Sequence, residues 1–152
     1  MILASMLAIP DGSLVFLEHS NNIVENETGS PITHVGIYVD GYIYEAVKPR
    51  VRKITVEEFK KKNKKYNIYF KSPVKEFNKQ ELAKIKDYLE DQVKRKYSVW
   101  GYITGHNVKG IHCGELVANA LSSSGRYTFK EPWDITPGEL WTLEDYQTLS
   151  GF

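Results

Sequence analysis

The most regular pattern of apolar and polar positions lies in the stretch NKQELAKIKDYLEDQVKRKY, which begins at Asn78. Its apolar residues recur every three or four positions: Leu82, Ile85, Leu89 and Val93. This is the period of a helix with one buried face. Asn78 and Glu81 precede most of this run with the spacing of a capping box, in which two side chains bind backbone N–H groups reciprocally. The pattern therefore predicts an amphipathic helix that begins after Asn78.

Three other stretches carry the start or stop signals of helices. HCGELVANALSSSG has apolar residues at helical spacing and ends at Gly125, a residue type that often terminates a helix. In TVEEF, Thr55 and Glu58 have capping-box spacing, and the lysine-rich run KKKNKK follows. In ITPGELW, Thr136 and Glu139 have the same spacing, with a proline at the first helical position. We therefore expect a helix in each stretch.

Apolar runs between turn signals predict the strands. These runs are DGSLVFLE from Asp11, THVGIYVDGYIYEAV from Thr33 to Val47, and YNIYFKSPV from Tyr66. Two further stretches, HSNNIVENETGSP from His19 and SVWGYITGHNVKGI from Ser98, are predicted to be loops. The 152 residues show no internal repeat and no linker, so they predict a single α+β domain over residues 1–152.

The turn signal Asp40-Gly41 divides THVGIYVDGYIYEAV into two strands. This dipeptide favours a two-residue type I′ turn, which fixes the register of a hairpin. Side chains alternate between the faces of a sheet, so His34 and Glu45 fall on one face as diagonal neighbours, roughly 7–8 Å apart at the backbone. Gly36 stands opposite Glu45 and leaves room for a contact between the two side chains. A register shift of one residue would instead separate them.

Cys113 is the only cysteine, and it stands at the predicted start of the helix in HCGELVANAL. The helix dipole and the N–H groups of a first turn favour a thiolate, and a nearby imidazole favours it further. Cys113, His34 and Glu45 would then be a nucleophile, a general base and an orienting carboxylate, and the N–H groups could hold an oxyanion. The alternative interpretation is a buried structural cysteine, a half-buried strand histidine and an exposed carboxylate. Glu115 is interpreted as a first-turn carboxylate that complements the helix dipole.

Composition and charge narrow the classes of function. The apolar fraction of 41% is typical of a globular protein. A net charge of +1 produces no field that would attract nucleic acid, so no nucleic-acid partner is expected. The run KKKNKK is interpreted as a solvated helix face, with binding of an anionic partner as the alternative.

The cysteine and histidine content argues against structural bridges and metals. One cysteine excludes an internal disulfide and a cysteine-based zinc site, and the four histidines form no metal-binding motif. No metal and no cofactor are therefore predicted. No segment has the apolar length of a transmembrane helix. The apolar start from Met1 to Pro10 lacks a positive charge and is interpreted as an initial helix or strand, or as the remnant of a trimmed leader, so cytoplasmic and exported locations stay open.

Together, the motifs resemble a known family. THVGIYVDGYIYEA resembles the strand pair of the NlpC-type papain-like cysteine peptidases, HCGELV resembles their nucleophile helix, and DGSLVF resembles the strand before the histidine. In the usual members the cysteine precedes the histidine, whereas here the order is His34, Glu45, Cys113. This order, with SPITHVGIY and the late ITPGEL, is similar to the circularly permuted branch of YiiX-like and, more distantly, lecithin:retinol acyltransferase-like proteins.

The resemblance implies a papain-like fold in which a small antiparallel sheet or half-barrel packs against the nucleophile helix. It also implies that Cys113 is the nucleophile, His34 the general base and then acid, and Glu45 the orienting residue. The branch often has tyrosine where this chain has His112, which is expected either to contact substrate or to position the helix. The residues expected to contact substrate are His112, Tyr102, Trp100 and Trp133. The aromatic ones are equally compatible with a place in the core.

The implied activity is a cysteine hydrolase that cleaves an amide. Its substrate would be a small bacterial cell-wall-type peptide, as derived from peptidoglycan, or an N-acyl amino acid. Because relatives in the branch act on lipid acyl groups, a lipid acyl hydrolase, acyltransferase or thioesterase is the first alternative. A catalytically silent binding module is the second, although such a module would not need Cys113, His34 and Glu45 together.

Overall fold

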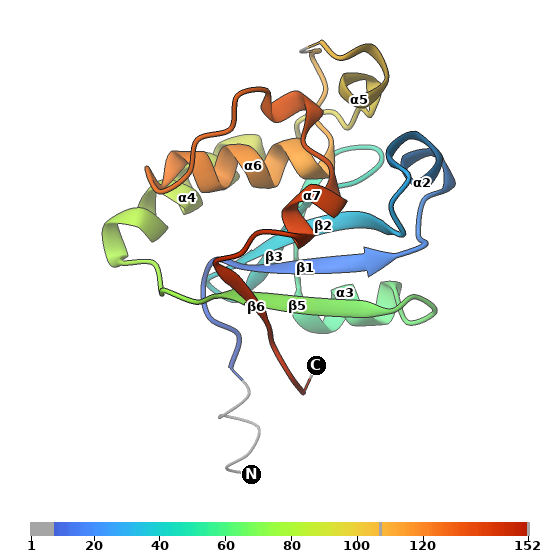
Figure 1. Ribbon diagram of the computed structural model, residues 1–152. Helices are drawn as coiled ribbons and strands as arrows, with labels where there is room; N and C mark the ends of the chain where they lie inside the picture. The colour runs from blue at the N-terminus through green and yellow to red at the C-terminus, as the bar shows by residue number, and fades with distance from the viewer. Residues whose placement is uncertain (1–7, 107, 152) are drawn as a thin grey trace.

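A six-stranded antiparallel sheet forms the centre of the computed structural model, which describes residues 8–106 and 108–151 (Figure 1). The strands are β1 (Ser13–Glu18), β2 (Ile32–Val39), β3 (Tyr42–Ala46), β4 (Val51–Thr55), β5 (Ile68–Pro73) and β6 (Tyr146–Thr148). They lie in the order β4-β3-β2-β1-β5-β6, and all neighbours are antiparallel. The predicted α+β class with an antiparallel sheet is therefore confirmed.

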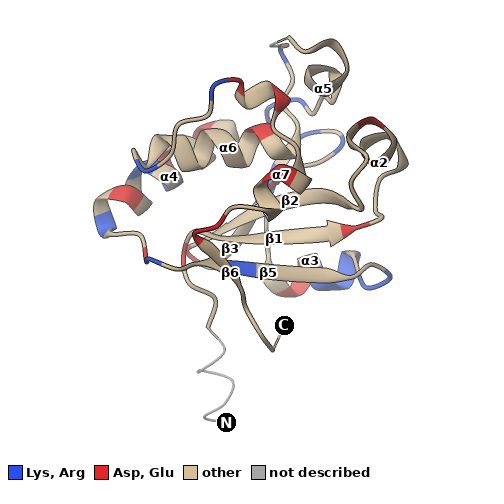
Figure 2. Cartoon of the chain, in the orientation of Figure 1, with Lys and Arg blue, Asp and Glu red and all other residues tan. Residues whose placement is uncertain are grey.

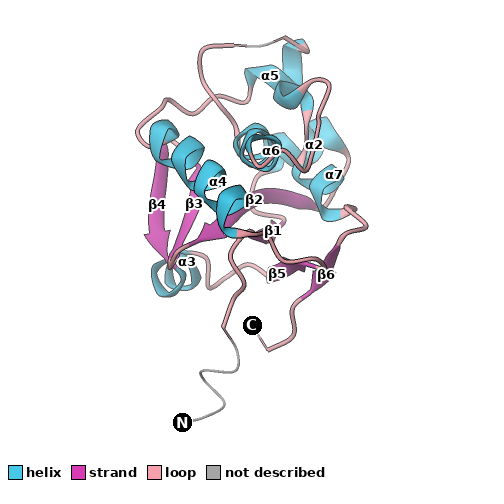
Figure 3. Ribbon diagram, turned by 90° about the vertical axis from the view of Figure 1, so that its left-hand side faces the viewer, coloured by secondary structure: helices cyan, strands magenta, loops and turns pink. Residues whose placement is uncertain are grey.

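Helices cover both faces of the sheet. They are α2 (Asn22–Thr28), α3 (Val56–Lys62), α4 (Lys79–Gln92), α5 (Trp100–Thr104), α6 (Cys113–Ser123), α7 (Pro137–Trp141) and the 3₁₀ helix η1 (Pro132–Asp134). Figures 1 and 3 show from two directions that α4 and α6 lie together over one face, whereas α3 covers the other. The helix that begins at Cys113, α6, packs on β2 and β3.

Alternation along the strands divides the core into two clusters. Ile37 of β2 and Tyr44 of β3 point toward α4 and α6, where they pack with Leu89 and Leu121. Ile43 points the other way and packs with Phe59 of α3. Each face of the sheet is thus closed by a helix, and the polar residues of the hairpin are confined to its ends.

The hairpin of β2 and β3 has the predicted register. Asp40 and Gly41 both have positive φ angles, 51° and 88°, as a type I′ turn requires. The residues flanking this turn, Val39 and Tyr42, pair directly across it. The register that places His34 and Glu45 on one face is therefore confirmed.

The local end signals of the helices are also confirmed. Capping boxes are present at Thr55 with Glu58, at Asn78 with Glu81 and at Thr136 with Glu139. Lysines of KKKNKK lie at the end of α3 and in the turn after it, where Figure 2 shows a blue segment. Most of these lysines are exposed. This distribution agrees with the interpretation of a solvated helix face.

Two segments predicted to be loops contain short helices, so these two predictions are wrong. The Asn21 side chain caps α2 by accepting bonds from the N–H groups of Ile23 and Val24, and Gly29 ends the helix at a φ of 69°. Val24 is the only buried residue of α2, so the apolar period that marks a longer helix is missing. α5 has five residues, which is too short for any period to be read.

Two strands at the edges of the sheet were not predicted. β4 follows a basic segment, and its buried residues Val51 and Ile54 are three positions apart, which breaks the alternation of a half-buried strand. β6 contains three residues at the opposite edge. The prediction for Met1 to Pro10 falls mainly on residues 1–7, which lie outside the described residues. Among the described residues, no helix is long and apolar enough to span a bilayer.

Candidate active site

The imidazole of His34 and the carboxylate of Glu45 meet at one end of the hairpin. Nε2 of His34 lies 2.7 Å from Oε1 of Glu45, and the two residues are 8% and 1% exposed. Gly36 lies between them in register, where a Cβ would come within 3.0 Å of Ile43 and 3.1 Å of the Tyr44 carbonyl oxygen. The backbone therefore fits closely at Gly36, and the hairpin brings the two polar side chains together.

Arg52 of β4 holds the other oxygen of the Glu45 carboxylate. β4 pairs with β3 so that Arg52 stands directly opposite Glu45. Its Nε and Nη2 atoms lie 3.0 and 2.9 Å from Oε2, while Oε1 is bound to His34. Burial opposes ionisation of Glu45, but the contacts with His34 and Arg52 outweigh it and lower the pKa of this carboxyl. Glu45 is therefore a buried, ionised group with both oxygens bound.

Cys113, the first residue of α6, is hydrogen-bonded to His34 and is 2% exposed. Because Nε2 of His34 faces Glu45, Nδ1 is the ring nitrogen left for the sulfur. Burial disfavours the imidazolium, but the hydrogen bonds and charges of Cys113 and Glu45 raise the pKa of His34 to about 10. The attraction is mutual, so the imidazolium favours the thiolate form of Cys113.

His112 is fully buried and serves as the N-cap of α6. Its Nδ1 accepts a bond from the backbone N–H of Glu115 at 3.2 Å, and its Nε2 donates to the carbonyl oxygen of Trp133 at 2.6 Å. Burial lowers the pKa of His112 to about 4, although the Trp133 carbonyl acts in the opposite direction. Of the two roles expected for His112, the structure favours positioning of the helix over contact with substrate.

Glu115 lies in the first turn of α6 and is 4% exposed. Its Oε1 has no hydrogen-bond partner among the described residues and lies 3.9 Å from Nε2 of His112. Burial raises the pKa of Glu115, against the opposing charge of Arg95. The Glu115 side chain is therefore part of the buried polar surroundings of the start of α6.

The aromatic residues predicted to contact substrate are dispersed. Trp100 on α5 is 59% exposed and lies on an apolar groove. Trp133 on η1 donates from Nε1 to the carbonyl oxygen of Gly105 at 3.1 Å and accepts from His112, which ties the end of α5 to the start of α6. The side chain of Tyr102 lies outside the described residues.

Tyr97 is a site residue that the sequence did not reveal. It is half-buried, and burial together with the charge of Cys113 raises the pKa of its hydroxyl. Tyr97 also lines a cavity of about 330 Å³ that opens beside His34. The other polar residues on this cavity include Thr33, Glu45, Lys48 and Arg52. No sequence pattern pointed to Tyr97, because a loop separates it from Cys113 and the path of that loop could not be predicted.

The described residues do not fit a metal centre. A transition-metal site needs several His, Cys, Asp or Glu ligands that converge on one point. No group of three or more such side chains that could hold an ion occurs in residues 8–106 and 108–151. Both oxygens of Glu45 are already bound to His34 and Arg52.

Neither a protein-family model nor a curated protein matches this chain. Among solved structures, it is similar to the crystal structure of the metalloprotein yiiX from Escherichia coli O157:H7. The TM-score is 0.72 at 13% sequence identity, over 95% of this chain and 98% of that chain. At this identity the similarity shows a common fold alone. The resemblance to YiiX-like proteins is thus confirmed for the fold, and the relationship to permuted papain-like peptidases stays a prediction.

Proposed function

We propose that this protein is a cysteine hydrolase that cleaves an amide bond through an acyl-enzyme intermediate. The observation that carries the proposal is the buried chain of contacts from Cys113 to His34 to Glu45, with Cys113 at the first residue of α6. This set supplies a nucleophile, a proton carrier and a fixed negative charge. The order of these residues along the chain also supports the permuted papain-like relationship.

In the first step, the Cys113 thiolate attacks the carbonyl carbon of the amide. A C–S bond forms, and the electron pair of the carbonyl π bond moves to its oxygen. N–H groups at the start of α6 and the hydroxyl of Tyr97 would donate to that oxyanion. A tyrosine hydroxyl keeps its proton at neutral pH, as a donor must, and burial with the charge of Cys113 raises the pKa of Tyr97 further. His34 then protonates the amine nitrogen, the C–N bond breaks and a thioester remains on Cys113.

In the second step, water releases the acyl group. Neutral His34 takes a proton from the water while its oxygen attacks the thioester carbon, and the C–S bond breaks to give the carboxylic acid. Glu45 stabilises the imidazolium at both stages, and Arg52 keeps the Glu45 carboxylate in place. The cycle consumes one amide and one water and regenerates the Cys113–His34 pair.

The mechanism is compatible with more than one class of substrate. A small cell-wall-type peptide and an N-acyl amino acid both contain an amide that this mechanism cleaves. Lipid esters and thioesters react with a thiolate in the same way, so a lipid acyl hydrolase is the second candidate. The observation that favours an acyl substrate is the apolar groove beside Tyr97, lined by Trp100 and Ile103.

The pH dependence of alkylation tests the proposal. Iodoacetamide reacts with thiolates, so its rate with Cys113 would be measured from pH 5 to 10 in the wild type and in His34→Ala. An ordinary thiol has a pKa near about 8.5, so a paired thiolate should react one to two orders of magnitude faster than it at about pH 6. His34→Ala should lose this low-pH rate.

The matched control is His19→Ala. His19 also binds a glutamate, Glu25, at 3.0 Å, but on the surface and away from Cys113. This variant should retain the wild-type profile. A wild-type thiol that titrates near pH 8.5, or that does not react, would contradict the hydrolase and favour a catalytically silent binding module.

A further inference from the structure

An apolar groove of about 650 Å³ runs beside the cavity of about 330 Å³ that His34, Glu45 and Arg52 line, which we call the catalytic cavity. Three of the most exposed large apolar side chains of the described residues line it: Ile23 at 51%, Trp100 at 59% and Ile103 at 43%. Pro49 and Val99 add to the same lining. A concave site of this volume with mostly apolar walls is typical of a small-molecule binding site. Binding of an apolar ligand would explain why this apolar surface is exposed.

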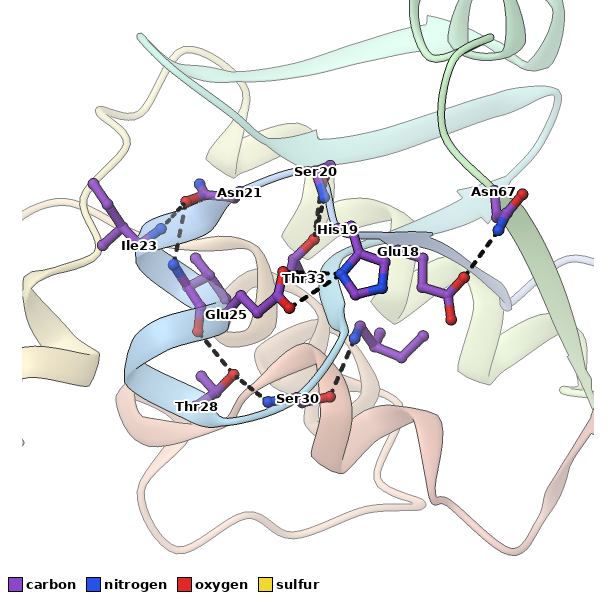
Figure 4. A network of polar contacts seen from close by, with 12 residues as sticks. Glu18, His19, Ser20, Asn21, Ile23, Glu25, Thr28, Ser30, Thr33 and Asn67 are labelled. Atoms are coloured by element: carbon purple, nitrogen blue, oxygen red, sulfur yellow. Dashed lines mark hydrogen bonds and ion pairs between the residues drawn. The ribbon is translucent and has the colours of Figure 1, made fainter.

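Short elements held in place by polar contacts build this groove. Figures 1 and 3 show α2, α5 and the loop between β3 and β4 at the same end of the molecule. In Figure 4, a polar network fastens α2 to the ends of β1 and β2: His19 binds Glu25, Ser20 binds Thr33, and Asn21 caps the helix. Ile23 is therefore presented by a helix that is fixed on both sides, as a preformed binding wall requires.

The groove is continuous with the catalytic cavity. Lys48 and Tyr97 line both of them. The charge of Cys113 acts on the hydroxyl of Tyr97, and His34 and Glu45 face the catalytic cavity. A ligand that extends from the groove past Tyr97 into the catalytic cavity would carry its middle portion past His34, the hydrogen-bond partner of Cys113.

Positive charge is available in the cavity for a negative group. Lys48 is exposed and makes no hydrogen bond or ion pair with any residue that the structure describes. Arg52 binds Glu45, yet 38% of its side chain is exposed. Glu45 already has two cationic partners, His34 and Arg52. The positive charge of Lys48 is therefore not neutralised by Glu45. The cavity thus favours an anion, whereas the groove favours an apolar chain.

We infer that the substrate is a long-chain acyl amide whose amine half carries a carboxylate. This inference rests on the proposed hydrolase and narrows its substrate. The acyl chain lies in the groove, the carbonyl reaches Cys113, and the carboxylate faces Lys48 and Arg52. The amine nitrogen then leaves on the side of His34, the group that protonates it. Cleavage breaks the C–N bond and adds the elements of water, which yields a fatty acid and an amino acid.

Binding is tested without turnover in Cys113→Ser, which keeps the size of the side chain. The probes are octanoylglycine, decanoylglycine and dodecanoylglycine, measured by isothermal titration calorimetry. The affinity should increase about fourfold for each methylene that enters the groove. Ile103→Ser and Ile23→Ser should each weaken binding of dodecanoylglycine about tenfold and flatten the dependence on chain length.

Matched controls separate the groove from general surface effects. Val74 is 59% exposed and lies outside the groove, so Val74→Ser should bind like the parent protein. Lys48→Gln should remove the preference for dodecanoylglycine over its neutral amide, dodecanoylglycinamide, whereas Lys79→Gln on the distant α4 should keep it. Circular dichroism melting curves verify that each variant is folded.

Three outcomes would overturn the inference: equal effects of Ile103→Ser and Val74→Ser, no dependence on chain length, or tighter binding of a lysophospholipid with the same chain. The alkylation profile of the wild type shows which proposal fails. Fast alkylation at pH 6 without binding of dodecanoylglycine overturns the acyl substrate and leaves the hydrolase standing. Tight binding of dodecanoylglycine by a protein with an ordinary thiol overturns the hydrolase and leaves the acyl ligand standing.

Discussion

Arg52 binds the carboxylate oxygen of Glu45 that His34 leaves unoccupied. The guanidinium lies 2.9 Å from Oε2, on the strand directly opposite Glu45. Glu45 is 1% exposed, and a buried carboxylate is costly unless its oxygens are bound. Arg52 therefore makes it possible to keep a fixed negative charge behind the imidazole of His34.

Replacing Arg52 by glutamine should raise the pKa of Glu45 and weaken the Cys113–His34 pair. The low-pH limb of alkylation should shift toward higher pH, because a less ionised Glu45 supports the imidazolium less well. The free energy of unfolding should decrease by about 1 kcal/mol, a small value because the arginine is partly exposed and its charge is screened.

The pH dependence of this loss has a defined sign. Contacts with Arg52 depress the pKa of Glu45 in the folded state, so their stabilisation is present above the ordinary glutamate pKa of 4.5 and is lost as the pH decreases. The difference between the variant and the wild type in urea denaturation should therefore shrink below that pH. Lys53→Gln is the matched control, since Lys53 is also 38% exposed and pairs with Glu90. An alkylation shift of equal size in both variants would contradict a specific role for Arg52.

Replacing Glu45 by glutamine keeps a hydrogen-bond acceptor for His34 but removes the charge. The imidazolium should lose its electrostatic support, and the alkylation rate of Cys113 at pH 6 should decrease about tenfold, which corresponds to about 1.4 kcal/mol. Stopped-flow or mass-spectrometric rate measurements test this. Glu25→Gln, which alters the surface pair with His19, should leave the rate unchanged.

The imidazole of His34 should titrate far above an ordinary histidine. Contacts with Cys113 and Glu45 overcome burial and raise its pKa to about 10, so its NMR signals should remain those of an imidazolium through neutral pH. In Cys113→Ala the thiolate partner is absent while burial persists, so the pKa should decrease by more than about one unit. Hydrolysis should also decline as the pH rises past 10, because His34 can no longer protonate the leaving amine. A pKa near 6.5 in the wild type would show that the pair does not form.

His112 should make the fold sensitive to acid. Its pKa of about 4 lies below the ordinary value of 6.5, so the unfolded chain binds the proton more readily than the folded one. Between these values the free energy of unfolding should decrease by up to about 1.4 kcal/mol for each pH unit of acidification.

His112→Asn keeps an N-cap acceptor for the N–H of Glu115 and removes the titrating group. Urea denaturation at several pH values between 4 and 7 should therefore give a flatter profile for the variant. The raised pKa of Glu115 contributes with the opposite sign in both proteins. Parallel profiles would contradict a neutral, buried His112.

The sequence predicted those parts of the site that depend on local rules. The two-residue turn at Asp40-Gly41 fixes the register of the hairpin, so the meeting of His34 and Glu45 followed from counting residues. The capping residues located the ends of three helices for the same reason. The place of Cys113 at a helix start also followed from its neighbours in sequence.

Residues that reach the site by tertiary packing could not be predicted. Arg52 meets Glu45 only because β4 pairs with β3, and the spacing of Val51 and Ile54 concealed that strand. Tyr97 approaches Cys113 through a loop whose path no local pattern specifies. α2 was missed although Asn21 and Gly29 carry the end signals of a helix, because a helix of seven residues with one buried side chain has no period.

The site is divided between two consecutive parts of the chain. His34, Glu45 and Arg52 come from β2, β3 and β4, whereas Cys113 comes from α6, and the exposed Val74 lies between the two groups. A chain cut near Val74 would put the base and the nucleophile on separate polypeptides. The first piece would keep five of the six strands, and the second would carry α4 and α6, which cover them. A thiol that alkylates rapidly at low pH would then appear only when the two pieces reassemble. Alkylation of Cys113 would thus measure the association of the two halves of a split protein.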